Sequence, residues 1–486
     1  MIRTLIRHGL FFSVYGLVFS SMLALVVFFN HLQSRSDLRP WHSAELDEEF
    51  RVTSSAAVRD LADYLQLEER LFRQLQEQVY DQLGPSDFRL LNRYNKGSLS
   101  DPGTFTHNWN RSFEMPVDDP RGGVLLIHGL SDSPYSMRSL AQSFHDMNYW
   151  VVGLRLPGHG TAPSGLLDST WEDFAAAVEI AAAHVQNKAG TDKPFFMAGF
   201  STGAALSVEY SLGILDGDDG RMPDGLILLS PAIGVTPLAA LAGWQARLSV
   251  LPGFEKTAWE SILPEFDPYR YKSFAVNAGD QIYRLTVQIS RLIDRLNNGE
   301  GIHGFPEVIA FQSVVDATVS TPDLVSGLFD HLADEGHELV LFDINRSAEV
   351  EPVLMQNPEA ATRALLENRR LPFTLTVLSN ASSQTSRLSI YQKLANSDVA
   401  TEAPSDLEWP DGVFALSHSS VPFPPDDSVY GTEADPEHPG IHLGRIDIQG
   451  ETGVLLFSAD EVIKLRYNPF HSYMIKRVEA FVKSVR

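Results

Sequence analysis

Apolar residues follow three patterns along the chain, and each pattern predicts a different kind of element. Residues 9–29 contain no charged residue, and a helix of about 20 such residues can cross the hydrocarbon core of a bilayer. Residues 58–79 carry Val, Leu and Phe mostly at three-to-four-residue spacing, which predicts an amphipathic helix. Beyond Pro120, short apolar runs alternate with helical stretches. This alternation predicts a mostly parallel sheet with helices on both faces.

The first apolar stretch is predicted to be a transmembrane helix over residues 9–29. Arg3, Arg7 and the amino terminus precede it, whereas Arg35 and Arg39 follow it. The positive-inside rule therefore favours, by a small margin, residues 1–8 in the cytoplasm and the body outside. In a bacterium, this topology places the body in the periplasm, anchored to the inner membrane.

A cleaved signal peptide is the alternative interpretation of the same stretch. The apolar region of such a peptide usually spans about 7 to 15 residues and ends in a site of small residues. The stretch here is longer, and Asn30, His31 and Leu32 follow it without forming such a site. The retained anchor is therefore the preferred prediction.

The chain after the span is expected to divide into two parts. Residues 30–110 are predicted to be a helical linker or stalk, and residues 111–486 to be one α/β domain. The amphipathic helix of the linker either packs on this domain or pairs in a coiled coil. Its few heptads favour packing.

Charge and composition narrow the possible partners and chemistries. The chain has 62 acidic and 38 basic residues, with a formal net charge of -24. Nucleic acids and anionic surfaces are therefore repelled on average, and no nucleic-acid partner is expected. The chain contains no cysteine, which excludes disulfides, thiol nucleophiles and cysteine metal ligands.

Residues 199–203 read GFSTG, between an apolar run and a helical run. A serine on such a sharp strand-to-helix turn has an exposed hydroxyl, and the glycines leave room where side chains would collide. The N-terminal end of the following helix favours the negative charge that develops during acyl transfer. Ser201 is therefore a candidate nucleophile, although short glycine–serine patterns also occur by chance.

A second motif, VLLIHGL, ends a predicted buried strand at His128. The loop after such a strand can supply one backbone donor to an oxyanion, and the residue after the nucleophile can supply another. The N–H groups of Leu130 and Thr202 are the predicted donors. His128 itself is expected to orient the loop by hydrogen bonding rather than to transfer protons.

The motifs IHGL, LPGHG and GFSTG, in this order and spacing, resemble those of α/β-hydrolases, in particular monoacylglycerol lipases and related carboxylesterases. The resemblance is close over about residues 122–231 and looser as far as Asp316 and His418. It implies the α/β-hydrolase fold, with a helical cap over the pocket. It also implies that the LPGHG loop, including His159, supports the site without catalysing.

In this fold an acid and then a histidine follow the nucleophile along the chain. Asp316 ends the apolar run VIAFQSVV and continues as DATVS, similar to the segment that carries the acid in the family. Asp343, after ELVLF, is the alternative acid. His418 is the predicted base, because the apolar residues 412–417 before it are expected to form a strand that delivers it. Three other late histidines follow no clear buried strand: His438, His442 and His471.

His418 lies much farther from Asp316 than the few tens of residues typical of the family. An insertion at about residues 346–411 is therefore predicted, with a helix, a further strand and a polar loop. Residues 233–305 are largely helical in pattern and rich in Leu and aromatic residues, and are expected to form the cap. An apolar cap would shield an acyl chain and exclude water.

These observations predict a serine hydrolase that cleaves a carboxylic ester through an acyl-enzyme intermediate. Ser201 attacks, His418 is the base, and Asp316 orients His418. The substrate is expected to be lipid-like, for example an acylglycerol, and no cofactor or metal is implied. Amide or peptide hydrolysis with the same residues is one alternative, and a non-catalytic interaction module tethered to the membrane is the other. The sequence leaves the oligomeric state open.

Overall fold

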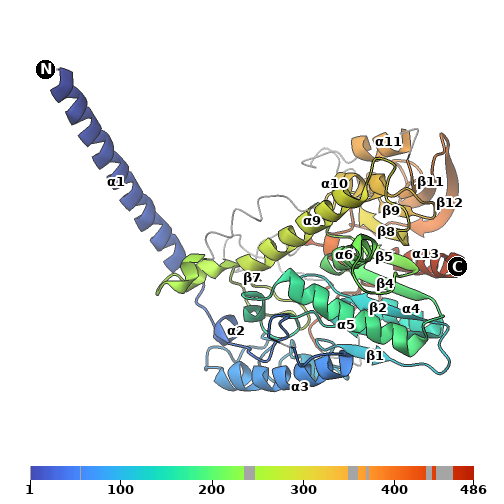
Figure 1. The fold of residues 1–486 in the computed structure, drawn as a ribbon, viewed down its shortest axis with the longest axis horizontal. Helices are drawn as coiled ribbons and strands as arrows, with labels where there is room; N and C mark the ends of the chain where they lie inside the picture. The colour runs from blue at the N-terminus through green and yellow to red at the C-terminus, as the bar shows by residue number, and fades with distance from the viewer. Residues whose placement is uncertain are drawn as a thin grey trace.

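The short apolar runs form one sheet through the body of the molecule (Figure 1). The computed structural model describes residues 2–54, 56–234, 247–348, 359–367, 371–433, 440–444 and 463–485. In this part of the chain the sheet has ten strands, in the order β1-β3-β2-β4-β5-β8-β9-β10-β11-β12. Their bounds are β1 Phe113–Met115, β2 Gly122–Ile127, β3 Tyr149–Leu154, β4 Phe195–Phe200, β5 Gly225–Leu229, β8 Glu307–Ser313, β9 Glu338–Phe342, β10 Thr374–Asn380, β11 Arg387–Lys393 and β12 Ala400–Glu408.

Every neighbouring pair from β3 to β10 is parallel. β1 pairs antiparallel at one edge, and β11 and β12 extend the other edge antiparallel. β2, β4 and β5 are buried along their whole length, as expected for strands that are covered on both faces. The predicted mostly parallel sheet is therefore confirmed.

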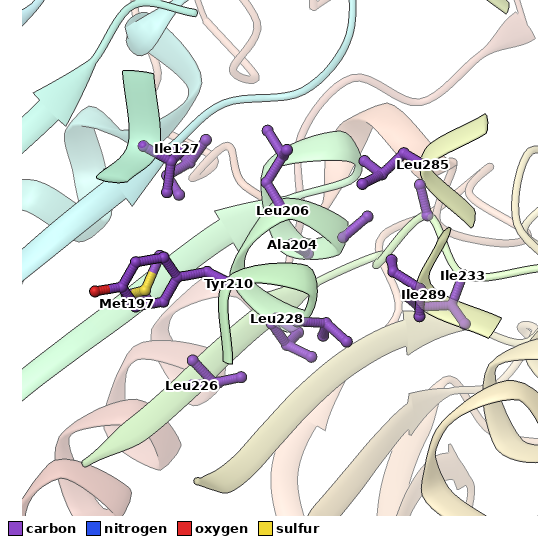
Figure 2. Close-up of a cluster of buried hydrophobic side chains, with 14 of the residues drawn as sticks. Ile127, Met197, Ala204, Leu206, Tyr210, Leu226, Leu228, Ile233, Leu285 and Ile289 are labelled. Atoms are coloured by element: carbon purple, nitrogen blue, oxygen red, sulfur yellow. The ribbon is translucent and has the colours of Figure 1, made fainter. Parts of the chain in front are cut away.

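Helices cover both faces of the sheet. Leu125 and Ile127 of β2 pack in one core cluster with α5, α6 and α9, whereas Val124 and Leu126 pack in another with α4 and α13. This division follows the two-residue period of a strand. Figure 2 shows part of the first cluster, where strand side chains meet those of α6 and α9. The helices of the two faces are α5 Trp171–Ala189, α6 Thr202–Asp216, α9 Val276–Leu296, α4 Arg138–Asp146 and α13 His471–Ser484.

The region predicted as a cap contains less helix than expected before α9. Residues 235–246 lie outside the described residues. Residues 247–258 contain two short 3-10 helices, and a two-stranded sheet follows, with β6 (Trp259–Ser261) and β7 (Phe274–Ala275). α9 forms the rest of the region and contributes Leu285 and Ile289 to the core cluster that also contains α6 side chains (Figure 2).

Residues 346–411, which were predicted to be an insertion, contribute strands at one edge of the sheet. Within their described part, α11 (Glu359–Glu367) precedes β10, which pairs parallel with β9 and matches the expected helix and strand. The polar stretch that was expected to be a loop instead contains β12, which makes that prediction wrong. β12 is an edge strand with mostly exposed side chains, so it lacks the apolar alternation that identifies a strand from sequence. Its Pro404 and acidic residues suit an edge that must not pair further.

The prediction of a strand at residues 412–417 is also wrong. No strand is assigned there, although Ala415 and Leu416 are buried and give the segment its apolar pattern. Individual hydrogen bonds, rather than a regular β-ladder, hold this segment. The Asn345 N–H donates to the Phe414 carbonyl at 2.7 Å, and Ser313 Oγ donates to the Leu416 carbonyl at 2.9 Å.

The segment before the sheet packs on the body. Asp60 caps α3 (Leu61–Gln78), and Leu61, Tyr64 and Leu67 join the core cluster that contains α5. The helix therefore has the packing arrangement, the first of the two alternatives left open by its sequence. The other helices of this segment and of the region after β8 are α1 Ile2–Ser34, α2 Pro40–Ser43 and α10 Thr321–Gly327.

A buried guanidinium ties this segment to the loop after β3. Arg155 is fully buried and makes a bidentate pair with Glu49, at 2.9 and 3.0 Å, and a hydrogen bond to Glu68 at 3.0 Å. Glu49 also accepts the Gly158 N–H at 2.7 Å. The carboxylates before the sheet thereby hold the LPGHG loop.

We expect Arg155→Met to destabilise the protein by about 3–5 kcal/mol, because it leaves two buried carboxylates without their cation. Chemical unfolding of the full chain in non-ionic detergent would measure this loss. The matched control is Arg70→Met, which removes an exposed pair with Glu48 and should cost about 1 kcal/mol or less. Equal stability losses in the two variants would contradict the structural role of Arg155.

α1 projects from the body (Figure 1). Its residues Tyr15–Ser34 have a mean hydropathy of 1.7 and are almost entirely exposed. By length and composition this part of the helix could cross a membrane, and a signal sequence near the N-terminus would pass the same test.

Candidate active site

Ser201 lies on the turn between β4 and α6 in a strained backbone conformation. Its φ of 52° and ψ of −109° are rare for a residue with a side chain. The Ser201 N–H donates to the Leu229 carbonyl at 2.9 Å, and the Ser201 carbonyl accepts the Ala232 N–H at 3.1 Å. The end of β5 and the loop after it therefore hold the strained turn through the N–H and the carbonyl of Ser201.

The flanking glycines allow the close approach that this turn requires. A Cβ on Gly199 would lie 2.2 Å from the Gly203 carbonyl carbon, and a Cβ on Gly203 would lie 2.1 Å from the Ile127 oxygen. A Cβ on Gly129 would lie 3.3 Å from that of Ser201. The loop after β2 thus passes directly beside the serine.

Ser201, His418 and Asp316 form a hydrogen-bonded chain. His418 Nε2 lies 3.0 Å from Ser201 Oγ, and His418 Nδ1 lies 2.7 Å from Asp316 Oδ2. The geometry assigns the ring proton to Nδ1, which donates to the carboxylate, and leaves Nε2 to accept the serine proton. The other oxygen of Asp316 accepts the N–H groups of Thr318 and Val319 at 2.8 and 2.9 Å, which fixes the carboxylate in place.

Two sequence matches accompany this geometry. Residues 118–295, which include Ser201 but end before Asp316 and His418, match the family model described as serine aminopeptidase, S33. A thermostable monoacylglycerol lipase of Bacillus sp. (strain H-257) is 25% identical over 238 residues, which cover 48% of this chain and 81% of the lipase. The chain is an α/β-hydrolase that resembles monoacylglycerol lipases.

Two solved structures are also similar to parts of this α/β-hydrolase. The Paleococcus ferrophilus monoacylglycerol lipase is 18% identical, covers 48% of this chain and 88% of its own, and superposes with a TM-score of 0.36. A soluble variant of the Saccharomyces cerevisiae monoglyceride lipase is 17% identical, covers 48% and 82%, and has a TM-score of 0.37. The fold assignment rests on the strand order and the sequence matches.

The alternative acid of the α/β-hydrolase is engaged elsewhere. Asp343 pairs with Arg346 at 2.9 and 3.1 Å and accepts the Ser379 hydroxyl at 2.6 Å. Among the alternative bases, His471 begins α13 and is buried, which lowers its pKa to about 4. His442 has an Nε2 without a hydrogen-bond partner among the described residues, and His438 lies outside them.

The contacts that position His418 were not predictable from its local sequence. Ser313 at the end of β8 holds Leu416, and Ser417 Oγ donates to the Leu465 carbonyl at 2.5 Å. The Phe200 ring lies 5.3 Å from the imidazole, between centroids. β8 therefore leads to Asp316 and also holds the segment that carries His418.

The predicted oxyanion donors are Leu130, on the loop after β2, and Thr202, at the start of α6. Thr202 is the first residue of α6, and N–H groups in a first helical turn have no partner within the helix. Leu130 precedes Ser131, which has a φ of 57°. The Ser131 carbonyl accepts the Tyr271 N–H at 2.8 Å, and Arg270 donates to Asp132 at 3.3 Å. The segment between β6 and β7 thus fixes the Leu130 loop, a contact for which the sequence carries no evident signal.

His128 and His159 are buried below the site, with their rings 5.1 Å apart. His128 Nδ1 donates to the Gly129 carbonyl at 2.8 Å, and Nε2 accepts the Leu156 N–H at 3.0 Å. Burial lowers the pKa of each of these histidines to about 3, so both rings are neutral near pH 7. In the described part of the chain, no cluster of three or more His, Asp and Glu could hold a metal ion.

Proposed function

We propose that this α/β-hydrolase cleaves a carboxylic ester of a lipid-like substrate, such as a monoacylglycerol, through an acyl-enzyme intermediate. The observation that carries the proposal is the hydrogen-bonded chain from Ser201 through His418 to Asp316, built on a strained turn. Such an arrangement allows the imidazole to remove the serine proton as the hydroxyl attacks a carbonyl carbon.

In the first half of the reaction, Ser201 Oγ bonds to the ester carbonyl carbon and its proton passes to His418 Nε2. The N–H groups of Leu130 and Thr202 stabilise the oxyanion, and Asp316 stabilises the imidazolium. The carbon–oxygen bond to the alcohol then breaks, and His418 returns the proton to the leaving oxygen. In the second half, water replaces the alcohol and releases the carboxylic acid and free Ser201.

One observation favours an ester over the amide alternative. The curated relative bears the name monoacylglycerol lipase, although the matching family model is described as a serine aminopeptidase.

The test compares three substrates with the full chain in non-ionic detergent: a monoacylglycerol, a p-nitrophenyl acyl ester and an aminoacyl p-nitroanilide. We expect both esters to be hydrolysed faster than the anilide, and a fluorophosphonate to modify the peptide that contains Ser201. Faster cleavage of the anilide would establish the amidase alternative. No ester turnover and no adduct would favour the non-catalytic interaction module.

A further inference from the structure

An exposed apolar surface lies at the foot of α1. Residues 248–254, which we name the apolar turn, include Val250, 82% exposed, and Leu251, 49% exposed. Phe254 at the end of the turn contacts Phe29 of α1, with ring centroids 6.1 Å apart. In Figure 1 the yellow-green segment that contains this turn lies against the lower end of α1.

Hydrogen bonds fix the foot of α1 to the segment that follows the apolar turn. Arg35 donates to the carbonyl oxygens of Lys256 and Glu260, both at 2.8 Å. Lys256 in return donates to the Arg35 carbonyl at 2.8 Å and pairs with Asp37 at 3.1 Å. Leu32 in the last turn of α1 is 3% exposed. The helix end and the apolar turn are therefore held together.

We propose that the apolar turn lies in the headgroup region of the bilayer that α1 crosses. A bilayer that surrounds the exposed part of α1 would meet Val250 and Leu251 where the helix leaves it, and their burial there is favourable. The contact uses uncharged side chains, which suits a chain whose net charge of -24 is repelled by anionic lipid. A zwitterionic lipid surface is thus the partner that this surface fits.

This placement rests on the proposed function, and it adds a route by which the substrate would reach Ser201. The apolar turn leads along the chain to Arg270 and Tyr271, which contact the loop beside Ser201. Residues 247–275 therefore carry both the surface proposed to face the lipid and the contacts to the loop beside Ser201. A lipid-like ester would enter from the bilayer rather than from water.

The absence of cysteine makes a site-specific test possible. Single cysteines replace Val250 or Leu251 in the full chain, and Leu394 or Val399 as controls, which are 60% and 66% exposed. Each is labelled with an environment-sensitive fluorophore and reconstituted in phosphatidylcholine vesicles. We expect a blue shift, and quenching by doxyl-labelled phosphatidylcholine, at the two turn positions only.

Quenching at neither turn position, or equal quenching at all four positions, would overturn the proposal. A blue shift that grows with protein density but is insensitive to the doxyl lipid would show that a second copy covers the turn, and would also overturn it. These measurements use no substrate, so their failure is independent of any failure of the proposed ester hydrolysis.

A second variant set links the surface to turnover. The double variant V250E/L251E should hydrolyse monoacylglycerol in phosphatidylcholine vesicles about tenfold more slowly, because two charges oppose seating in the membrane. Its rate on a water-soluble short-chain ester should not change, and the control V399E should match the parent on both substrates. Equal rates of the double variant and the parent on vesicles would contradict entry from the bilayer.

Discussion

Replacement of Ser201 by alanine is expected to lower kcat for ester hydrolysis by about a million-fold, because a triad without its nucleophile retains only the contributions of binding and of the oxyanion donors. The substitution removes one hydroxyl from a residue that is 8% exposed and leaves the hydrogen bonds of its backbone in place. Steady-state hydrolysis of a p-nitrophenyl ester measures the loss, and circular dichroism checks the fold.

Ser211→Ala is the matched control for this variant. Ser211 lies on α6, and its hydroxyl donates to the Ser207 carbonyl within the same helix. We expect the control to keep kcat close to that of the parent. A Ser201→Ala protein that retained a tenth of the parent activity would exclude Ser201 as the nucleophile.

The second large effect separates the two candidate acids. Asp316→Asn should lower kcat by about ten-thousand-fold, because the amide no longer stabilises the imidazolium and favours the wrong tautomer of His418. Asp343→Asn is expected to keep kcat near the parent value and to lower the unfolding temperature instead, since it weakens the pair with Arg346. The measurements are kcat on the same ester and thermal unfolding of both variants.

The reverse result, a large loss of kcat in Asp343→Asn and a small one in Asp316→Asn, would assign the orienting role to Asp343. The two residues follow neighbouring parallel strands, β8 and β9, so both substitutions test the same edge of the sheet. They differ in hydrogen-bond partners, which makes each the control of the other.

The turn that carries Ser201 was predictable from the sequence because the residues that this turn requires are neighbours in the chain. Gly199 and Gly203 must be glycine where a Cβ would meet backbone at about 2 Å, and the adjoining apolar strand and helix are contiguous with them. The buried parallel strands were predictable for the same reason, since full burial on both faces leaves continuous apolar runs.

The segment that delivers His418 was harder to predict because distant residues determine its conformation. Ala415 and Leu416 have the apolar pattern of a strand, but Asn345 and Ser313, far away in sequence, satisfy the backbone in place of a ladder. The prediction for β12 was wrong in the opposite direction: a strand was read as a loop, because an exposed edge strand needs polar residues. Contacts at long sequence separation decide the first case, whereas the second depends on the exposed position of β12 at the sheet edge beside β11.

The bidentate pair between Glu49 and Arg155 limits how far the chain can be shortened from its N-terminus. A form that begins at residue 36 would lose α1 and keep both carboxylates that face the guanidinium. A form that begins at residue 51 would lose Glu49 and leave a buried cation with one carboxylate and a Gly158 N–H without its acceptor. The residues between the end of α1 and the buried Trp41 are thus the window in which α1 and the body can be separated.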